Sequence, residues 1–272
     1  MALMSATVHA LVSDPVRLTS VLVTGADRAL LIDTGSGPDQ AARILAAVRG
    51  LTALPLTVAN THDHWDHFFG NPTFAEAGVT DFAASAAFVR DSPGSAWLQH
   101  AEASEHVLDL PSPDGLTVEA RAVADGETLD LGALPSRGAG EPHSGADGAH
   151  LVEFLPLSGH TDTDLALRAG PVVVCGDLIE EGAPPQVGLD ATPLAWVRSL
   201  DRLLALPGVD VFVPGHGTAV TRGFVEAQRE DLLRAADSDD LDALPSRSAG
   251  TAAAHAAPAS DPPYGVRIVR LL

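Results

Sequence analysis

Short apolar segments separated by turn residues run through the first part of the chain. Residues 18–24 and 29–33 have the composition of β-strands and are joined by a Gly-Ala-Asp turn. Residues 39–49 then repeat apolar side chains at helical spacing. Further segments of the same kinds are a strand at 56–59, a short helix at 68–78 and a strand at 82–84. This alternation of strands and helices favours an α/β fold.

The rest of the chain continues in the same way. Residues 93–110 are compatible with a helix, and 116–124 with 127–131 predict a β-ribbon. The Gly-, Ser-, Pro- and Ala-rich segment 133–149 predicts a mobile loop, and the sequence leaves open whether it closes over a site. The remaining predicted elements are strands at 151–156, 165–168, 172–175 and 209–213, an amphipathic helix at 194–206 and a charged helix at 223–236.

We interpret residues 1–236 as one hydrolase-sized domain, because single α/β domains of this length are common. Residues 237–263 are acidic and then rich in Ala, Ser and Pro, which predicts a surface or flexible segment. Residues 264–272 have a strand-like pattern and are expected to return to the same domain.

Composition narrows the classes of partner. Hydrophobic residues make up 46% of the chain, enough for a large core. The chain has 16 basic residues, all of them Arg, and 36 acidic residues. The resulting net charge of −20 argues against nucleic-acid and membrane partners, so we expect the partner to be a small molecule. The sole cysteine, Cys175, excludes an internal disulfide. With no secretory signal or membrane-spanning segment in view, we expect a cytoplasmic protein; the oligomeric state is not predicted.

One segment concentrates metal-ligating side chains. The run His62-Asp63-His64-Trp65-Asp66-His67 holds three imidazoles and two carboxylates in six positions. Imidazole nitrogen and carboxylate oxygen are ligands that zinc takes. In an extended loop His62 and His64 project to one side, while Asp66 and His67 can face a second metal. The alternative is a solvated polar loop.

Three later turns each add one potential ligand directly after an apolar strand. They are His160 in Gly159-His160-Thr161, Asp177 in Gly176-Asp177, and His216 in Gly215-His216-Gly217. Taken singly, each residue is more typical of a turn or cap. Glycine in each turn permits close approach of the backbone, so together the turns indicate a site built at converging strand ends.

The order of these residues resembles the five signature motifs of the metallo-β-lactamase superfamily. Leu31-Ile32-Asp33-Thr34-Gly35 resembles the first motif and H-x-H-x-D-H at 62–67 the second, and the five occur in order between Asp33 and Gly217. The resemblance implies a four-layer αββα sandwich of the α/β class, with the metal site at the edge between two sheets.

The resemblance also implies a role for each residue. His62, His64 and His160 would hold one metal, and Asp66, His67 and His216 a second. Asp177 would bridge the two metals. Asp33 would support a ligand by hydrogen bonding, although a plain turn before Gly35 is an alternative. The implied cofactor is two Zn²⁺, and the same ligands also suit Fe or Mn.

The implied reaction is hydrolysis of a small ester, thioester, lactone or amide by a metal-bridging hydroxide, with Asp66 as the catalytic residue that orients it. An aspartate at 177 resembles the general hydrolase and glyoxalase II-like branch rather than a true β-lactamase. The chain departs from many relatives in having Gly-His-Thr-Asp-Thr-Asp at 159–164. The substrate of a related enzyme is therefore not a safe guide to the substrate of this chain. The alternative is a mononuclear iron oxidoreductase of the persulfide dioxygenase type.

Substrate contacts are less defined by the sequence. Trp65 lies inside the metal-ligand run and is interpreted either as a pocket wall that binds substrate or as a packing residue. Glu180 and Glu181 are interpreted as a solvated turn rather than as groove residues. Trp97, His100 and His106 are assigned ordinary surface or core positions in preference to a lid.

Overall fold

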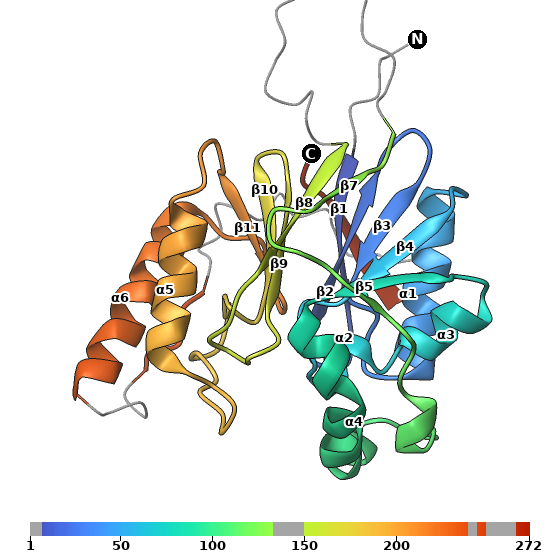
Figure 1. Cartoon of the computed structure of the whole chain (residues 1–272), viewed down its shortest axis with the longest axis horizontal. Helices are drawn as coiled ribbons and strands as arrows, with labels where there is room; N and C mark the ends of the chain where they lie inside the picture. The colour runs from blue at the N-terminus through green and yellow to red at the C-terminus, as the bar shows by residue number, and fades with distance from the viewer. Residues whose placement is uncertain (1–6, 133–149, 239–243, 249–264) are drawn as a thin grey trace, which may run out of the picture.

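Two β-sheets lie face to face in the computed structural model, and helices cover the outer face of each (Figure 1). The structure describes residues 7–132, 150–238, 244–248 and 265–272. The four layers are helix, sheet, sheet and helix, so the predicted αββα sandwich of the α/β class is confirmed.

The first sheet has seven strands in the order β12-β1-β2-β3-β4-β5-β6. Their bounds are β1 (Thr7–Ser13), β2 (Leu18–Thr24), β3 (Ala29–Ile32), β4 (Leu56–Ala59), β5 (Asp81–Ala84), β6 (Arg121–Ala122) and β12 (Val266–Arg270). β1, β2 and β3 pair antiparallel, and β3 to β6 pair parallel. The helices α1 (Pro38–Leu51) and α3 (Asn71–Glu76) connect parallel strands. They pack on the outer face of this sheet.

The second sheet has five strands in the order β11-β10-β9-β8-β7. Their bounds are β7 (Thr128–Asp130), β8 (Leu151–Pro156), β9 (Leu165–Ala169), β10 (Val172–Gly176) and β11 (Val211–Pro214). The helices α5 (Pro193–Leu204) and α6 (Arg222–Ser238) cover its outer face. α2 (Trp65–Phe68) and α4 (Ala86–His106) lie below the first sheet in Figure 1.

Alternate side chains of each strand enter different cores. In β10, Val172 and Val174 face the other sheet, whereas Val173 and Cys175 face the layer of α5 and α6. Successive side chains of a strand point to opposite faces, so strands buried on both faces read as continuous apolar runs. Cys175 is buried and lies in the strand that was predicted at 172–175.

Three predictions about individual elements were wrong. The expected ribbon of 116–124 and 127–131 does not form, because β6 pairs with β5 in the first sheet and β7 pairs with β8 in the second. The chain passes from one sheet to the other between them. The predicted helix at 93–110 begins earlier, at Ala86, where the Ser85 hydroxyl accepts a hydrogen bond from the Phe88 amide. Residues 68–78 are divided between α2 and α3.

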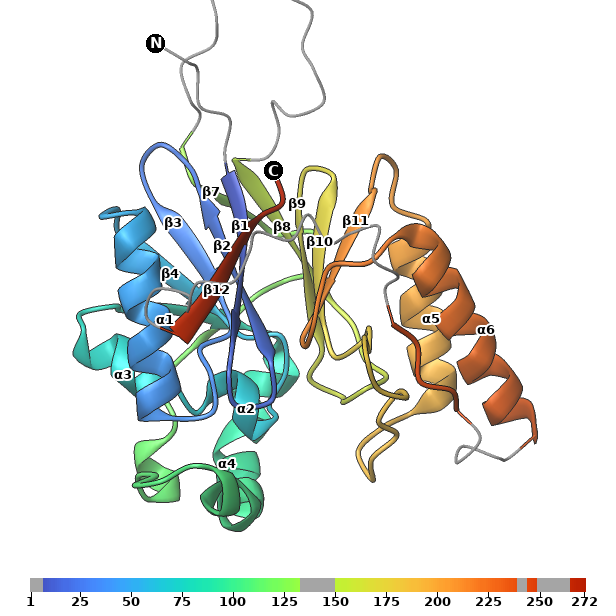
Figure 2. The same cartoon turned by 180° about the vertical axis from the view of Figure 1, so that it is seen from behind.

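The C-terminal residues return to the first sheet. The strand expected at 264–272 is observed as β12, which pairs antiparallel with β1 at the sheet edge (Figure 2). Of the segment 237–263, Asp237 and Ser238 complete α6, and Leu244 packs beneath it. The remainder of that segment, apart from 244–248, and the loop expected at 133–149 lie outside the described residues. No helix in the described ranges combines the length and apolar character needed to cross a membrane.

Candidate metal centre

The residues predicted as metal ligands lie at strand ends that meet at one edge of the two sheets. The run from His62 to His67 follows β4 and enters α2, and His160 follows β8. Asp177 directly follows β10, and His216 lies just beyond β11. Segments that are up to 154 positions apart in sequence, counted from 62 to 216, therefore supply one cluster.

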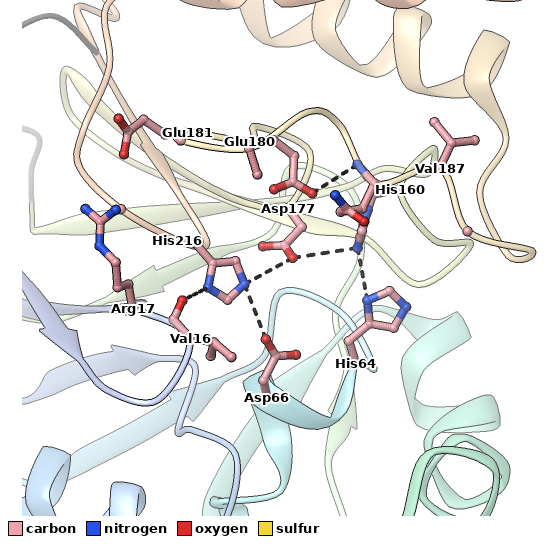
Figure 3. Close-up of a pocket in the computed structure, with 15 residues that line it drawn as sticks. Val16, Arg17, His64, Asp66, His160, Asp177, Glu180, Glu181, Val187 and His216 are labelled. Atoms are coloured by element: carbon pink, nitrogen blue, oxygen red, sulfur yellow. Dashed lines mark hydrogen bonds and ion pairs between the residues drawn. The ribbon is translucent and has the colours of Figure 1, made fainter. Parts of the chain in front are cut away.

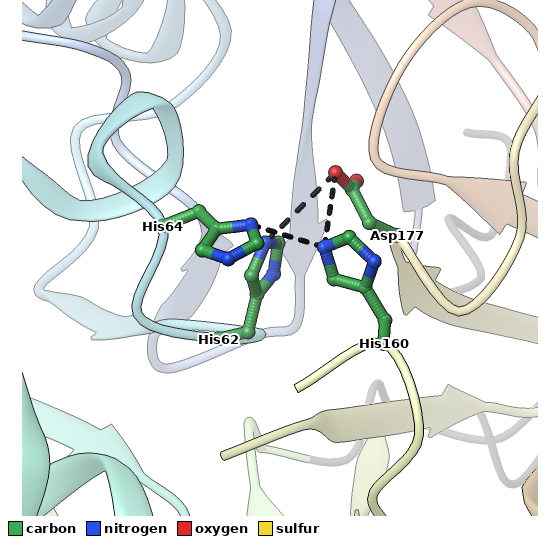
Figure 4. Close-up of side chains that lie close together, drawn as sticks. All are labelled: His62, His64, His160 and Asp177. Carbon is green, nitrogen blue, oxygen red and sulfur yellow. Dashed lines mark hydrogen bonds and ion pairs between the residues drawn. The ribbon is translucent and has the colours of Figure 1, made fainter. Parts of the chain in front are cut away.

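The first group contains His62, His64, His160 and Asp177, with one potential ligand atom from each within 4.8 Å of the others (Figure 4). His160 Nε2 lies 3.0 Å from His64 Nδ1 and 3.8 Å from Asp177 Oδ2. His62 Nε2 and Asp177 Oδ1 are buried without a hydrogen-bond partner. Buried polar atoms without partners are costly, so these two atoms fit a site that is completed by a cation.

The second group contains Asp66, His67 and His216. The two imidazole Nε2 atoms lie 3.3 Å apart, and His216 Nε2 lies 3.3 Å from Asp66 Oδ2. Asp177 is next to both groups, since its Oδ2 is also 3.3 Å from His216 Nε2. The carboxylate of Asp177 is therefore located where both groups can share it.

Asp33 supports this group from behind. It is 1% exposed, and its carboxylate oxygens accept hydrogen bonds from the Thr61 amide, the Thr61 hydroxyl and His67 Nδ1 at 2.8, 2.8 and 2.9 Å. The bond to Nδ1 directs the other ring nitrogen of His67 into the cluster. Asp33 has φ 62°, a left-handed conformation that aspartate tolerates better than most residues.

Three other histidines of the cluster are oriented through their outer nitrogens in the same way. His216 Nδ1 donates to the Val16 carbonyl at 2.9 Å, and His62 Nδ1 lies 3.0 Å from the Thr61 hydroxyl. His64 Nε2 lies 2.9 Å from Asp190 Oδ2, which leaves Nδ1 facing the cluster. These contacts fix the rings before any metal binds.

Burial and neighbouring charges shift the pKa values in opposite directions. Burial lowers the pKa of His160 to about 4, which keeps its imidazole neutral and able to ligate. Burial also opposes the charge of His67, but the carboxylates of Asp177, Asp66 and Asp33 outweigh it and raise the pKa of His67 to about 10. Thus a proton offsets carboxylate charge in the second group, and a cation binding there would displace it.

A cavity of about 480 Å³ opens over the cluster (Figure 3). His64, Asp66, His160, Asp177 and His216 form part of its wall. The other lining residues are Val16, Arg17, Glu180, Glu181, Gly182, Ala183, Gln186, Val187, Gly188 and Gly217. A small molecule therefore has access to both groups.

The sequence comparison identifies the family. Residues 14–216 match the profile described as the metallo-beta-lactamase superfamily. The chain belongs to this superfamily.

Solved structures share the fold of this superfamily member. A di-iron-bound form of TTHA1623 has 26% identity and a TM-score of 0.60, covering 79% of this chain and 95% of that one. The metallo-beta-lactamase FIM-1 from Pseudomonas aeruginosa, in a mono-zinc form, has 17% identity and a TM-score of 0.61, covering 86% and 94%. A metallo-beta-lactamase from Erythrobacter litoralis has 18% identity and a TM-score of 0.59, covering 86% and 95%.

Trp65 does not line the cavity of this metallo-β-lactamase superfamily member. It is 8% exposed, packs with Phe68 and Phe88, and stacks on the His106 ring at 5.7 Å between centroids. Of the two interpretations that the sequence left open, the structure favours packing. The expected solvated turn at Glu180 and Glu181 was wrong, because these residues are 5% and 9% exposed and line the cavity.

The turn that carries His160 explains the departure from the usual motif. Asp164 is buried, and its carboxylate accepts hydrogen bonds from the His160 amide at 3.0 Å and the Thr161 hydroxyl at 2.8 Å. This carboxylate closes the turn in the sequence Gly-His-Thr-Asp-Thr-Asp. His160 keeps its position toward the cluster despite the altered loop.

Two supporting residues were not found by sequence reasoning. Asp190 reaches His64 from 126 positions away, in a loop without a recognisable motif. Gln99 of α4 donates to the Asp63 carbonyl and accepts from the Trp65 amide, both at 2.8 Å, and so holds the backbone on either side of His64. The sequence contains no local signal for either contact, because each depends on how distant segments pack.

Proposed function

We propose that this chain is a dinuclear metal-dependent hydrolase that cleaves a small ester, thioester, lactone or amide. Membership of the metallo-β-lactamase superfamily and the histidine–aspartate cluster support a metal-dependent hydrolase-type enzyme. The observation that carries the dinuclear proposal is the presence of two adjacent donor sets with Asp177 next to both. We propose one catalytic domain over residues 1–236, to which the C-terminal strand returns.

In this proposal, His62, His64 and His160 would hold one metal, Asp66, His67 and His216 would hold the other, and Asp177 would be shared by the two. Neutral imidazole and carboxylate are the donors that zinc takes, and the buried His62 Nε2 without a partner fits a metal ligand. We propose zinc as the native metal. Iron or manganese suits the same donors, and the similar structure of TTHA1623 was determined in a di-iron-bound form.

Bound divalent cations would lower the pKa of a water molecule and polarise the scissile carbonyl. Asp66 lies at the cavity wall, and its Oδ2 is 3.3 Å from His216 Nε2. Burial opposes its charge, but His67 and His216 keep the pKa of Asp66 at about 2, so it is an acceptor across the working pH range. Asp66 would accept a hydrogen bond from the attacking water and direct it at the carbonyl.

We assign the chain to the general hydrolase and glyoxalase II-like branch rather than to the true β-lactamases. The support is the aspartate at position 177, where the resemblance implies a different residue in antibiotic-degrading enzymes. Its pKa is held well below the usual range: burial opposes the charge, but His216 and His67 outweigh it. Asp177 is therefore a carboxylate that two cations can share.

The proposal is tested by hydrolysis of thioesters, lactones, esters and β-lactams before and after chelation, with activity restored by added metal. His216→Ala should lose nearly all activity, because it removes a ligand of the second group. His106→Ala is the matched control, since this exposed histidine stacks on Trp65 outside the cavity. Chelator-insensitive hydrolysis would contradict the proposal. Oxygen uptake by a protein with one iron per chain and no hydrolase activity would favour the oxidoreductase.

A further inference from the structure

The turn between β1 and β2 is fixed against the metal centre by its backbone. Every carbonyl from residue 13 to residue 17 accepts a hydrogen bond. The donors are Gln40 Nε2 to Ser13 and Pro15 at 3.3 Å, Arg43 Nη2 to Asp14 at 2.5 Å, His216 Nδ1 to Val16 at 2.9 Å and the Gly217 amide to Arg17 at 3.2 Å. The position of this turn is thus tied directly to the loop that carries His216.

The turn also holds an unfavourable backbone conformation. Val16 and Arg17 have φ 59° and 56°, in the left-handed region that residues other than glycine, asparagine and aspartate rarely adopt. Such residues persist only where their surroundings impose the conformation, and they concentrate at ligand-binding sites. The hydrogen bonds to the turn carbonyls impose it here. Their effect is to hold Arg17 at the wall of the cavity.

Arg17 contributes a free positive charge to this wall. It is the one arginine among the lining residues, and Figure 3 shows it on the same side of the cavity as His216. Within the described parts of the chain, its guanidinium has no hydrogen-bond or ion-pair partner. By contrast, Arg121 pairs with Asp81 and Glu127. In a chain with a net charge of −20, an unpaired guanidinium beside a catalytic cavity is available to a ligand.

We infer that Arg17 anchors a carboxylate of the substrate, so that the proposed hydrolase acts on an acyl compound that carries a second, negatively charged end. This inference rests on the proposed function, because it names the substrate class of the same site. A guanidinium binds a carboxylate through two parallel hydrogen bonds, which gives orientation as well as attraction. The Glu181 carboxylate on the same cavity wall disfavours a more highly charged phosphate.

The test compares binding of glutarate with binding of pentanoate to the zinc-loaded protein by calorimetry. Both have five carbons and one carboxylate that can reach the metals, and glutarate adds a second. The wild type should prefer glutarate, and Arg17→Gln should lower that preference about tenfold, the loss expected for one charge-assisted contact at a partly solvated site. Arg17→Lys should retain part of the preference, because it keeps the charge but loses the planar fork.

Arg198→Gln is the matched control for net charge, because Arg198 is exposed and lies outside this cavity. It should keep the wild-type preference. An equal ratio of glutarate to pentanoate affinity in the wild type and Arg17→Gln would overturn the inference, as would a wild type that prefers neither or that binds inorganic phosphate more tightly than glutarate. The binding measurement needs no turnover. A glutarate preference that depends on Arg17, in a protein that hydrolyses none of the panel, would support the anchor and refute the hydrolase.

Discussion

Replacing Asp33 with asparagine tests whether this residue orients a metal ligand. The carboxylate accepts three hydrogen bonds, from the Thr61 amide, the Thr61 hydroxyl and His67 Nδ1. An asparagine has one acceptor oxygen, and its NH₂ group would face a donor. Asparagine also tolerates the left-handed φ of 62° at this position, so the turn itself should be preserved.

The magnitude follows from the lost contact to His67. A hydrogen bond to a charged group contributes about 1.5–3 kcal/mol, more than for a neutral pair. Since about 1.4 kcal/mol is a factor of ten, the second metal should bind roughly 10- to 100-fold more weakly in Asp33→Asn. The same range is typical when the carboxylate partner of a ligating histidine is removed. The first metal should be affected less, because Asp33 contacts no histidine of that group among the described residues.

The assay is competition between the protein and a zinc-binding dye, which resolves a tight and a weak site. Asp231→Asn is the control, since Asp231 is also a buried aspartate but pairs with Arg234 and Arg247, away from the cluster. It should lower stability without changing either zinc affinity. If Asp33→Asn bound both metals as tightly as the wild type, the proposed orienting role would be refuted and the turn-forming interpretation would stand.

Three further perturbations follow from the geometry. Gly215→Ala should abolish zinc binding at the shared carboxylate, because a Cβ there would lie 1.9 Å from Asp177 Oδ1. Gly223→Ala is the control, since a Cβ there meets nothing within 4 Å. Equal zinc content in both variants would refute this prediction. Trp65→Ala should lower the free energy of unfolding in denaturant by about 3–5 kcal/mol. An unchanged stability with an altered KM would instead support the interpretation that Trp65 binds substrate. Zinc affinity at the second group should rise at least about tenfold per pH unit between pH 6 and 8, because the metal displaces protons held there. Although burial opposes both charges, neighbouring carboxylates raise the pKa of His67 to about 10 and that of His216 well above its usual range. Calorimetry in buffers of different ionisation enthalpy would contradict this if it detected no proton release.

The layers of the fold could be predicted because their strands and helices follow from local patterns of apolar and turn residues. The strands at 18–24 and 56–59 have the predicted bounds, since apolar runs ended by turn residues define a strand that is buried on both faces. Pairing partners were not predictable in the same way. The segments at 121–122 and 128–130 are neighbours in sequence but join different sheets, and no hydrophobic pattern encodes which edge a strand selects.

The residues of the candidate centre likewise divide into those that a local sequence pattern predicts and those that only tertiary packing brings to the site. The run at 62–67 could be identified because its ligands lie within six positions, and the later turns each followed an apolar strand. Asp190 and Arg17 could not, because their proximity to the site comes from the packing of loops that carry no motif. Glu180 and Glu181 were predicted to form a solvated turn, because acidic pairs are seldom buried. Only the tertiary structure encloses them.

The most direct test of the dinuclear centre is metal analysis of the purified protein, with zinc returned after chelation. Two metal ions per chain, with the second lost in His216→Ala and the first retained, are expected from the two donor groups. Hydrolysis should rise with occupancy of the second site. A wild-type protein that saturates at one metal ion per chain, with no further binding at high zinc, would contradict the account.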